Sequence, residues 1–209
     1  MLLHFDYDGV IADSMPQLLS LTRRAQQAVG FGRPPSTQDY ATIEYLTFEN
    51  HARCLGIPEA RVQNFVSTIF DLQGAELWDV PVYPGIQPVL TALSLQHQIA
   101  IVTSSLTRVV WRSLSLQGLD SAVSAVFGGE LGLSKAERIA RSCAKRGIDP
   151  ARTFMVGDTV GDIQQGRLAG ARTVAVAWGF HPRLMLLSAA PDFIADQPQD
   201  LLTILSAHL

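Results

Sequence analysis

The segment LLHFDYDGV, residues 2–10, begins as an apolar strand and runs directly into Asp6 and Asp8, after which Gly9 allows a sharp turn. Two carboxylates at the end of a buried strand are costly unless they are compensated. The pattern recurs in TFMVGDTVGD, residues 153–162, where a second apolar strand leads into Asp158 and Asp162. We therefore expect these acids to form one metal site, assembled from distant parts of the chain.

Composition narrows the class of protein. The chain has 209 residues and is 47% hydrophobic, which suffices for one core with a small inserted domain. Its net charge of −3 disfavours a nucleic-acid partner. Acids interrupt the apolar N-terminus, and no apolar run approaches the ~20 residues that span a bilayer. We expect a cytoplasmic protein without a membrane partner, favour a monomer, and expect Cys54 and Cys143 to be reduced, buried thiols.

The order of elements predicts an α/β fold. After the first strand, short apolar runs rich in β-branched residues predict strands at residues 99–102, 125–127, 153–156 and 173–177. Helices are predicted at residues 88–96, 108–117, 136–146 and 162–169, and the tail suggests a short strand near 192–196 and a closing helix from residue 200. Such alternation indicates a parallel sheet with helices on both faces, which carries ligands beyond the carboxyl ends of its strands.

A long insertion follows the first strand. Residues 14–82 contain no convincing strand, and they predict helices at 15–29, 38–54 and 59–73 with a short turn near Glu76. An insertion of this length directly after an active-site loop is seldom a passive connection. We expect residues 14–82 to form an α-helical cap on an α/β core made of residues 1–13 and 83–209.

The acids at the strand ends suit phosphoryl transfer. Asp6 is the candidate nucleophile, because a carboxylate can attack phosphorus and form an aspartyl-phosphate. Asp8 can then protonate the leaving oxygen and later activate water. Asp158 and Asp162 complete an oxygen site for Mg²⁺, and Lys135, which opens the helix after the third strand, helps to offset repulsion between carboxylate and phosphate.

A candidate phosphate cradle follows the second strand. Thr103, Ser104 and Ser105 offer hydroxyls and free backbone N–H groups at a predicted helix start. Taken singly, each of these motifs has an ordinary alternative: a turn with capping acids, a helix cap or a solvated lysine. Their order at successive strand ends favours one shared site.

With these motifs the chain resembles the haloacid dehalogenase superfamily over nearly its whole length. The four motifs of that superfamily match the segment Asp6 to Val10, Thr103, Lys135, and the segment Gly157 to Asp162. The resemblance implies a Rossmann-like core, a small α-helical cap, an aspartyl-phosphate intermediate and Mg²⁺ dependence. It also implies that Asp6 and Asp158 bind the metal by their side chains and Asp8 by its backbone carbonyl. The C-terminal part looks most like phosphoglycolate phosphatase-type members.

Among such relatives, Asp8 disfavours a dehalogenase, and the lack of lysine before residue 135 disfavours phosphonoacetaldehyde hydrolase. A phosphatase of a small phosphorylated metabolite is the leading interpretation. Two alternatives stay open: a mutase of the β-phosphoglucomutase type, with Arg23, Arg24 or Arg53 gripping phosphate, and a non-catalytic member that binds a ligand or partner. In the cap, Glu44, Tyr45, His51 and Arg53 are candidate pocket residues, with solvated helix faces as the alternative.

Overall fold

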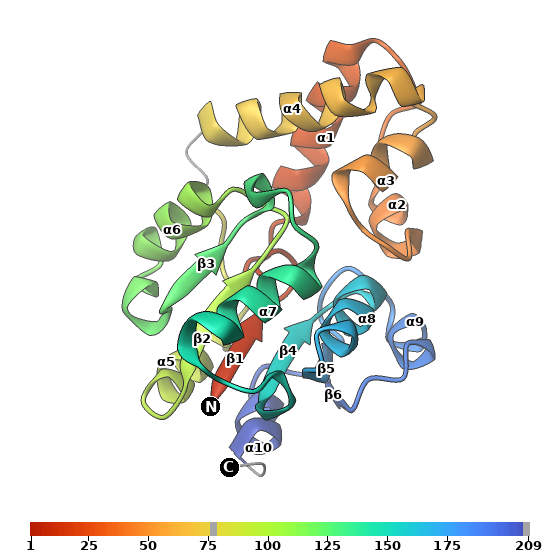
Figure 1. Ribbon diagram of the computed structural model, residues 1–209. Helices are drawn as coiled ribbons and strands as arrows, with labels where there is room; N and C mark the ends of the chain where they lie inside the picture. The colour runs from red at the N-terminus through yellow and green to blue at the C-terminus, as the bar shows by residue number, and fades with distance from the viewer. Residues whose placement is uncertain (76–78, 207–209) are drawn as a thin grey trace.

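Six parallel strands form a single sheet in the computed structural model, which describes residues 1–75 and 79–206 (Figure 1). In chain order the strands are β1 (Leu2–Phe5), β2 (Gln98–Val102), β3 (Ala125–Phe127), β4 (Thr153–Gly157), β5 (Arg172–Val176) and β6 (Phe193–Ala195). Their order across the sheet is β3-β2-β1-β4-β5-β6. The predicted strands are confirmed to within about a residue at most ends, and β1 lies at the centre, where the order of connection reverses.

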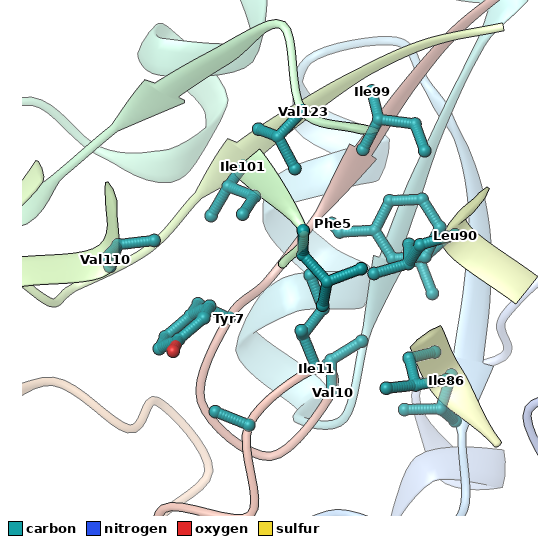
Figure 2. Packing of buried hydrophobic residues seen from close by; sticks show 14 of the residues in the cluster. Phe5, Tyr7, Val10, Ile11, Ile86, Leu90, Ile99, Ile101, Val110 and Val123 are labelled. Atoms are coloured by element: carbon teal, nitrogen blue, oxygen red, sulfur yellow. The ribbon is translucent and has the colours of Figure 1, made fainter. Parts of the chain in front are cut away.

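Helices cover both faces of this sheet, as predicted. The helices α5 (Ile86–Ser94), α6 (Thr107–Leu116) and α10 (Asp200–Ser206) pack on one face, and α7 (Lys135–Arg146), α8 (Val160–Leu168) and α9 (Arg183–Ser188) pack on the other. Side chains alternate along β1, so Phe5 packs in the core beneath α5, α6 and α10, while Leu2 packs in the core beneath α7 on the opposite face. Figure 2 shows Phe5 packed with Leu90 of α5 and Ile101 of β2. Short 3₁₀ helices occur at Asp120–Ala122, Gly129–Leu131 and Pro150–Arg152.

The insertion forms a helical cap of α1 (Met15–Val29), α2 (Thr37–Thr42), α3 (Phe48–Cys54) and α4 (Glu59–Ala75) beyond the carboxyl ends of the strands (Figure 1). Its own core includes Ala25 of α1, Ala52 of α3 and Phe65 of α4. The chain leaves and re-enters the sheet domain through adjacent segments. The backbone N–H of Asp13 donates a hydrogen bond to the Pro81 carbonyl, and that of Tyr83 donates to the Ile11 carbonyl, both at 2.9 Å.

One predicted helix is wrong. Residues 38–54 do not form a single helix, because the backbone of Ile43 turns to an extended conformation after α2. The Thr47 hydroxyl then accepts a hydrogen bond from the Asn50 N–H at 3.2 Å and starts α3. The break frees residues 43–47 to reach the sheet domain, where the Ile43 carbonyl lies 3.1 Å from the His181 Nε2. The turn expected near Glu76 lies outside the described residues.

The two cysteines differ from one another. Both are free thiols, but only Cys143 is buried, so the expectation of a buried Cys54 is wrong. Cys54 is exposed at the end of α3, where its sulfur lies 3.5 Å from the guanidinium of Arg33. Within the described part of the chain, no helix has the length and apolarity that crossing a membrane requires.

Candidate active site

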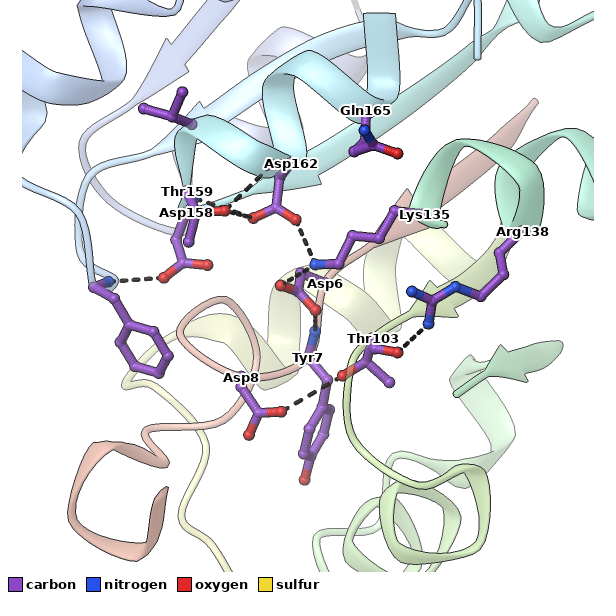
Figure 3. Close-up of polar contacts among 12 residues, drawn as sticks. Asp6, Tyr7, Asp8, Thr103, Lys135, Arg138, Asp158, Thr159, Asp162 and Gln165 are labelled. Atoms are coloured by element: carbon purple, nitrogen blue, oxygen red, sulfur yellow. Dashed lines mark hydrogen bonds and ion pairs between the residues drawn. The ribbon is translucent and has the colours of Figure 1, made fainter. Parts of the chain in front are cut away.

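The predicted residues meet at the carboxyl edge of the sheet (Figure 3). Asp6, Thr103 and Asp158 directly follow β1, β2 and β4, which are neighbours in the sheet. Asp162 lies in the first turn of α8, where Thr159 starts the helix: the Thr159 hydroxyl accepts from the Asp162 N–H at 3.2 Å. The Thr159 hydroxyl and N–H also donate to the Asp162 carboxylate, at 2.7 and 3.1 Å. Helix capping therefore fixes Asp162 beside the strand ends.

Three of these acids form a tight buried cluster. One carboxylate oxygen each from Asp6, Asp158 and Asp162 lies within 4.8 Å of the others. Burial, together with the neighbouring charge of Asp162, raises the pKa of Asp6 to about 7 even though a lysine opposes the shift. Burial likewise raises the pKa of Asp158 well above its ordinary value. Neighbouring carboxylates that disfavour each other's ionised forms create a strong demand for a cation.

Lys135 supplies part of that positive charge. Its ammonium lies 2.5 Å from Asp6 Oδ2 and also forms an ion pair with Asp162 Oδ1. Burial alone would lower the pKa of Lys135, but the carboxylates of Asp162 and Asp6 outweigh it and raise the pKa above its ordinary value. When all three carboxylates are ionised, the lysine neutralises one of them and leaves two negative charges. That balance fits a divalent cation.

Two glycines pack so closely against Asp158 that neither position has room for a side chain. A Cβ on Gly9 would lie 2.1 Å from Asp158 Oδ2, and a Cβ on Gly179 would lie 2.3 Å from the same atom. The Phe180 N–H donates to Oδ2 at 2.7 Å. Among the described residues, nothing donates a hydrogen bond to the buried Oδ1. The carboxylate is thus held through Oδ2, and Oδ1 is left without a partner in the acid cluster, as expected of an oxygen that binds a metal.

Asp8 lies beside the cluster and has different partners. Its Oδ2 accepts a hydrogen bond from Ser105 Oγ at 2.7 Å, and Thr103 Oγ1 lies 3.5 Å away. The Ser105 hydroxyl in turn accepts from the side-chain amide of Gln73 on α4 at 2.9 Å. Burial raises the pKa of Asp8, although these hydroxyls work against the shift. A raised pKa lets the carboxyl keep its proton to higher pH, which suits a general acid.

The candidate phosphate-binding residues separate into two groups. Thr103, Ser104 and Lys135 line a cavity of about 410 Å³ above the acids, whereas Ser105 is fully buried and does not line it. Arg138, which the sequence analysis missed, lies one helical turn after Lys135 and also lines the cavity. Its guanidinium donates to the backbone carbonyls of Thr103 and Phe127. The i, i+3 spacing of two cations on one helix face could have revealed it.

The helical cap closes the other side of this cavity. Of the four candidates in the cap, Tyr45 and His51 line the cavity, whereas Glu44 and Arg53 do not. Glu44 is exposed and accepts a hydrogen bond from Gln164, and Arg53 pairs with Glu59 on the outer surface. Arg23 and Arg24, proposed for a mutase, are exposed residues outside the cavity lining. The described cap residues that line the cavity are Leu18, Tyr40, Tyr45, Leu46, Thr47, Phe48, Glu49, His51, Val66 and Phe70.

Residues 3–176 match the family model described as haloacid dehalogenase-like hydrolase. The chain belongs to this family. The match covers β1 to β5 and both acid-ended strands, so the resemblance noted in the sequence is confirmed. The expectation of an enzyme of the haloacid dehalogenase type that hydrolyses phosphate monoesters is confirmed as well.

Named relatives extend over almost all of this haloacid dehalogenase-like chain. A phosphoglycolate phosphatase from Synechococcus elongatus is 30% identical and covers 95% of the chain and 93% of its own length. An N-acetylmuramic acid 6-phosphate phosphatase from Pseudomonas aeruginosa is 27% identical, covering 98% and 94%. A haloacid dehalogenase-like hydrolase structure from Streptococcus pneumoniae superposes with a TM-score of 0.85 at 22% identity, covering 98% and 97%. The last likeness shows the shared fold.

Proposed function

We propose that the chain is a Mg²⁺-dependent phosphatase that hydrolyses a small phosphorylated metabolite through an aspartyl-phosphate on Asp6. The observation that carries this proposal is the contact of Asp6 with Lys135 inside a buried cluster of carboxylates. A carboxylate oxygen of Asp6 attacks phosphorus, an O–P bond forms, and the bond from phosphorus to the leaving oxygen breaks. Lys135, Thr103 and Ser104 line the space where the phosphate oxygens would lie.

Asp8 acts as general acid when the aspartyl-phosphate forms and as general base when it is hydrolysed. Its protonated carboxyl donates to the leaving alcohol oxygen as the ester bond breaks. The resulting carboxylate then takes a proton from the water that attacks the aspartyl-phosphate, which releases inorganic phosphate and restores Asp6. The Ser105 hydrogen bond at 2.7 Å orients Asp8 for both transfers.

A magnesium ion would be held by the side chains of Asp6 and Asp158, with Asp162 close by and the Asp8 backbone carbonyl as a further oxygen. When bound, it supplies positive charge that lets an anionic carboxylate approach an anionic phosphate. The acid cluster, the two negative charges left by Lys135 and the unpartnered Oδ1 of Asp158 support this assignment.

We further assign residues 1–13 and 83–209 to the catalytic core and residues 14–82 to the helical cap. The paired linkers near Asp13 and Pro81 support these boundaries, since the chain crosses between the two parts at neighbouring points. A cap over the cavity would keep bulk water from the reacting groups. The names of the relatives make phosphoglycolate one candidate substrate.

Phosphate release from p-nitrophenyl phosphate tests the proposal. We expect turnover with Mg²⁺, none with EDTA, and a loss of at least about 10³-fold in Asp6→Asn because no nucleophile remains. The rate of Asp8→Asn should also fall severely. Asp13 is an exposed acid near Asp8 in the sequence, and Asp13→Asn should keep a nearly normal rate. A wild-type rate in Asp6→Asn would show that the nucleophile is misassigned. Product analysis with sugar phosphates separates hydrolysis from mutase transfer.

A further inference from the structure

The cap wall of the cavity is mostly apolar and carries little charge. Among the described cap residues that line it, most are apolar or aromatic, none is lysine or arginine, and Glu49 carries the one formal charge. The cations that line the cavity, Lys135 and Arg138, both belong to the sheet domain. Lys135 pairs with Asp6 and Asp162, and Arg138 donates to backbone carbonyls. The described part of the cap therefore presents no lysine or arginine to the leaving group.

His51 is the polar exception in this wall. It lines the cavity, its side chain is only 1% exposed, and neither ring nitrogen has a hydrogen-bond partner among the described residues. Its ring packs edge-on against Tyr40 with centroids 4.6 Å apart. Burial lowers the pKa of His51 to about 4, so the imidazole is neutral and offers one donor and one acceptor. A buried polar group without a partner calls for one from a ligand.

The aromatic wall is continuous with the acid cluster. Tyr40 contacts Phe180 in the sheet domain, with ring centroids 5.8 Å apart. The backbone N–H of Phe180 holds Asp158, and the Phe180 side chain also lines the cavity. A phosphate at the acids would therefore place its leaving group against aromatic and aliphatic side chains. A carboxylate on that leaving group would meet no opposite charge there and would be repelled by Glu49.

We infer that the leaving group of the substrate is an uncharged alcohol that carries an apolar ring and one hydrogen-bonding group for His51. This inference rests on the proposed phosphatase function, and it names the substrate class that the cavity accepts. It separates this chain from a role on phosphoglycolate, whose leaving group is anionic. The ring packs against Tyr40, Phe48 and Phe70, and the polar group pairs with the imidazole.

Matched esters test the charge preference. Phosphoglycolate and 2-hydroxyethyl phosphate differ by a carboxylate in place of a neutral hydroxymethyl group, and benzyl phosphate has an apolar ring in that position. We expect kcat/KM to rise about tenfold or more at each step from phosphoglycolate to 2-hydroxyethyl phosphate to benzyl phosphate. Equal or faster hydrolysis of phosphoglycolate would overturn the inference. Failure to hydrolyse any ester, p-nitrophenyl phosphate included, would instead contradict the proposed phosphatase.

Two variants test the residues. Glu49→Gln should raise the ratio of kcat/KM for phosphoglycolate to kcat/KM for 2-hydroxyethyl phosphate several-fold, because the removed negative charge repels only the anionic leaving group. His51→Phe keeps an aromatic ring beside Tyr40 but removes both nitrogens. Wild type should prefer 4-(hydroxymethyl)benzyl phosphate over 4-methylbenzyl phosphate, and His51→Phe should lose that preference. An unchanged preference would contradict the role of His51, and an unchanged anion penalty in Glu49→Gln would contradict that of Glu49.

Discussion

Gln73 in the helical cap is linked to Asp8 in the sheet domain through a single hydroxyl group. The Gln73 amide donates to Ser105 Oγ at 2.9 Å, and that hydroxyl donates to Asp8 Oδ2 at 2.7 Å. The Gln73 carbonyl oxygen also accepts from the Leu106 N–H at 3.0 Å, and the side chain is fully buried. The position of the cap is therefore coupled to the orientation of the proposed acid and base.

Ser105→Ala should move the pH profile of the reaction. The Ser105 hydrogen bond lowers the pKa of Asp8 against the larger effect of burial, so removing the hydroxyl raises that pKa further. Because Asp8 must be protonated to donate, the alkaline limb of kcat should shift to higher pH. Ser104→Ala is the matched control, since Ser104 lines the cavity without a hydrogen bond to Asp8, and it should change KM alone. A limb that stays in place would contradict this role.

Gln73→Leu should destabilise the fold as well as slow catalysis. The change leaves the buried Leu106 N–H without its partner, which costs roughly 1–3 kcal/mol of unfolding free energy. Urea denaturation measures this cost, and kcat should fall because Ser105 loses its fixed orientation. Gln63→Leu, an exposed glutamine on the same helix, is the control and should change both quantities little. Equal stability of the two variants would show that the contact contributes nothing.

Magnesium affinity should rise with pH. The pKa of Asp6 is about 7 without a cation, so a proton occupies this carboxyl below that pH and must leave when the metal binds. The ionised form dominates above pH 7, and the dissociation constant for Mg²⁺ should fall roughly tenfold from pH 6 to pH 8. Calorimetric titration with MgCl₂ in two buffers of different ionisation enthalpy would detect the released proton. A dissociation constant independent of pH would contradict the raised pKa.

Asp39 should stabilise the cap in a pH-dependent manner. Two hydrogen bonds from Arg33, at 2.9 and 2.5 Å, together with the Ser36 N–H lower the pKa of Asp39 to about 2. A lowered folded-state pKa contributes stability above the unfolded value near 4, and the contribution is lost as pH falls through about 2.

Asp39→Asn should therefore unfold more easily at pH 7, by roughly 1–2 kcal/mol. The gap to wild type should shrink as pH falls from 5 toward 2, as thermal unfolding across this range would show. The exposed pair of Asp196 with Arg183 gives the control, because Asp196→Asn should be nearly neutral. A gap that is constant with pH would contradict the ionic contribution of Asp39.

The sequence contained enough information to place the acids, and the reason is energetic. A buried strand that ends in carboxylates is costly without compensation, and alternating strands and helices bring such ends to one edge of a parallel sheet. Asp6, Asp158 and Asp162 were predicted to meet on these grounds, and they do. Lys135 was predicted from its place at a helix start, and it contacts two of the three.

Only the tertiary structure decided which cap side chains face the cavity. Periodicity defines the faces of a helix, but it does not say which face meets a neighbour, so Glu44 and Arg53 were as plausible as Tyr45 and His51. The break at Ile43 coincides with a contact to His181, far away in the sequence, which local propensity does not register. Gln73 had no sequence signal because its partners, Ser105 and Leu106, follow it by more than thirty residues. Chemistry carried by costly buried charges can be recognised from the sequence, whereas specificity that depends on packing between distant segments cannot.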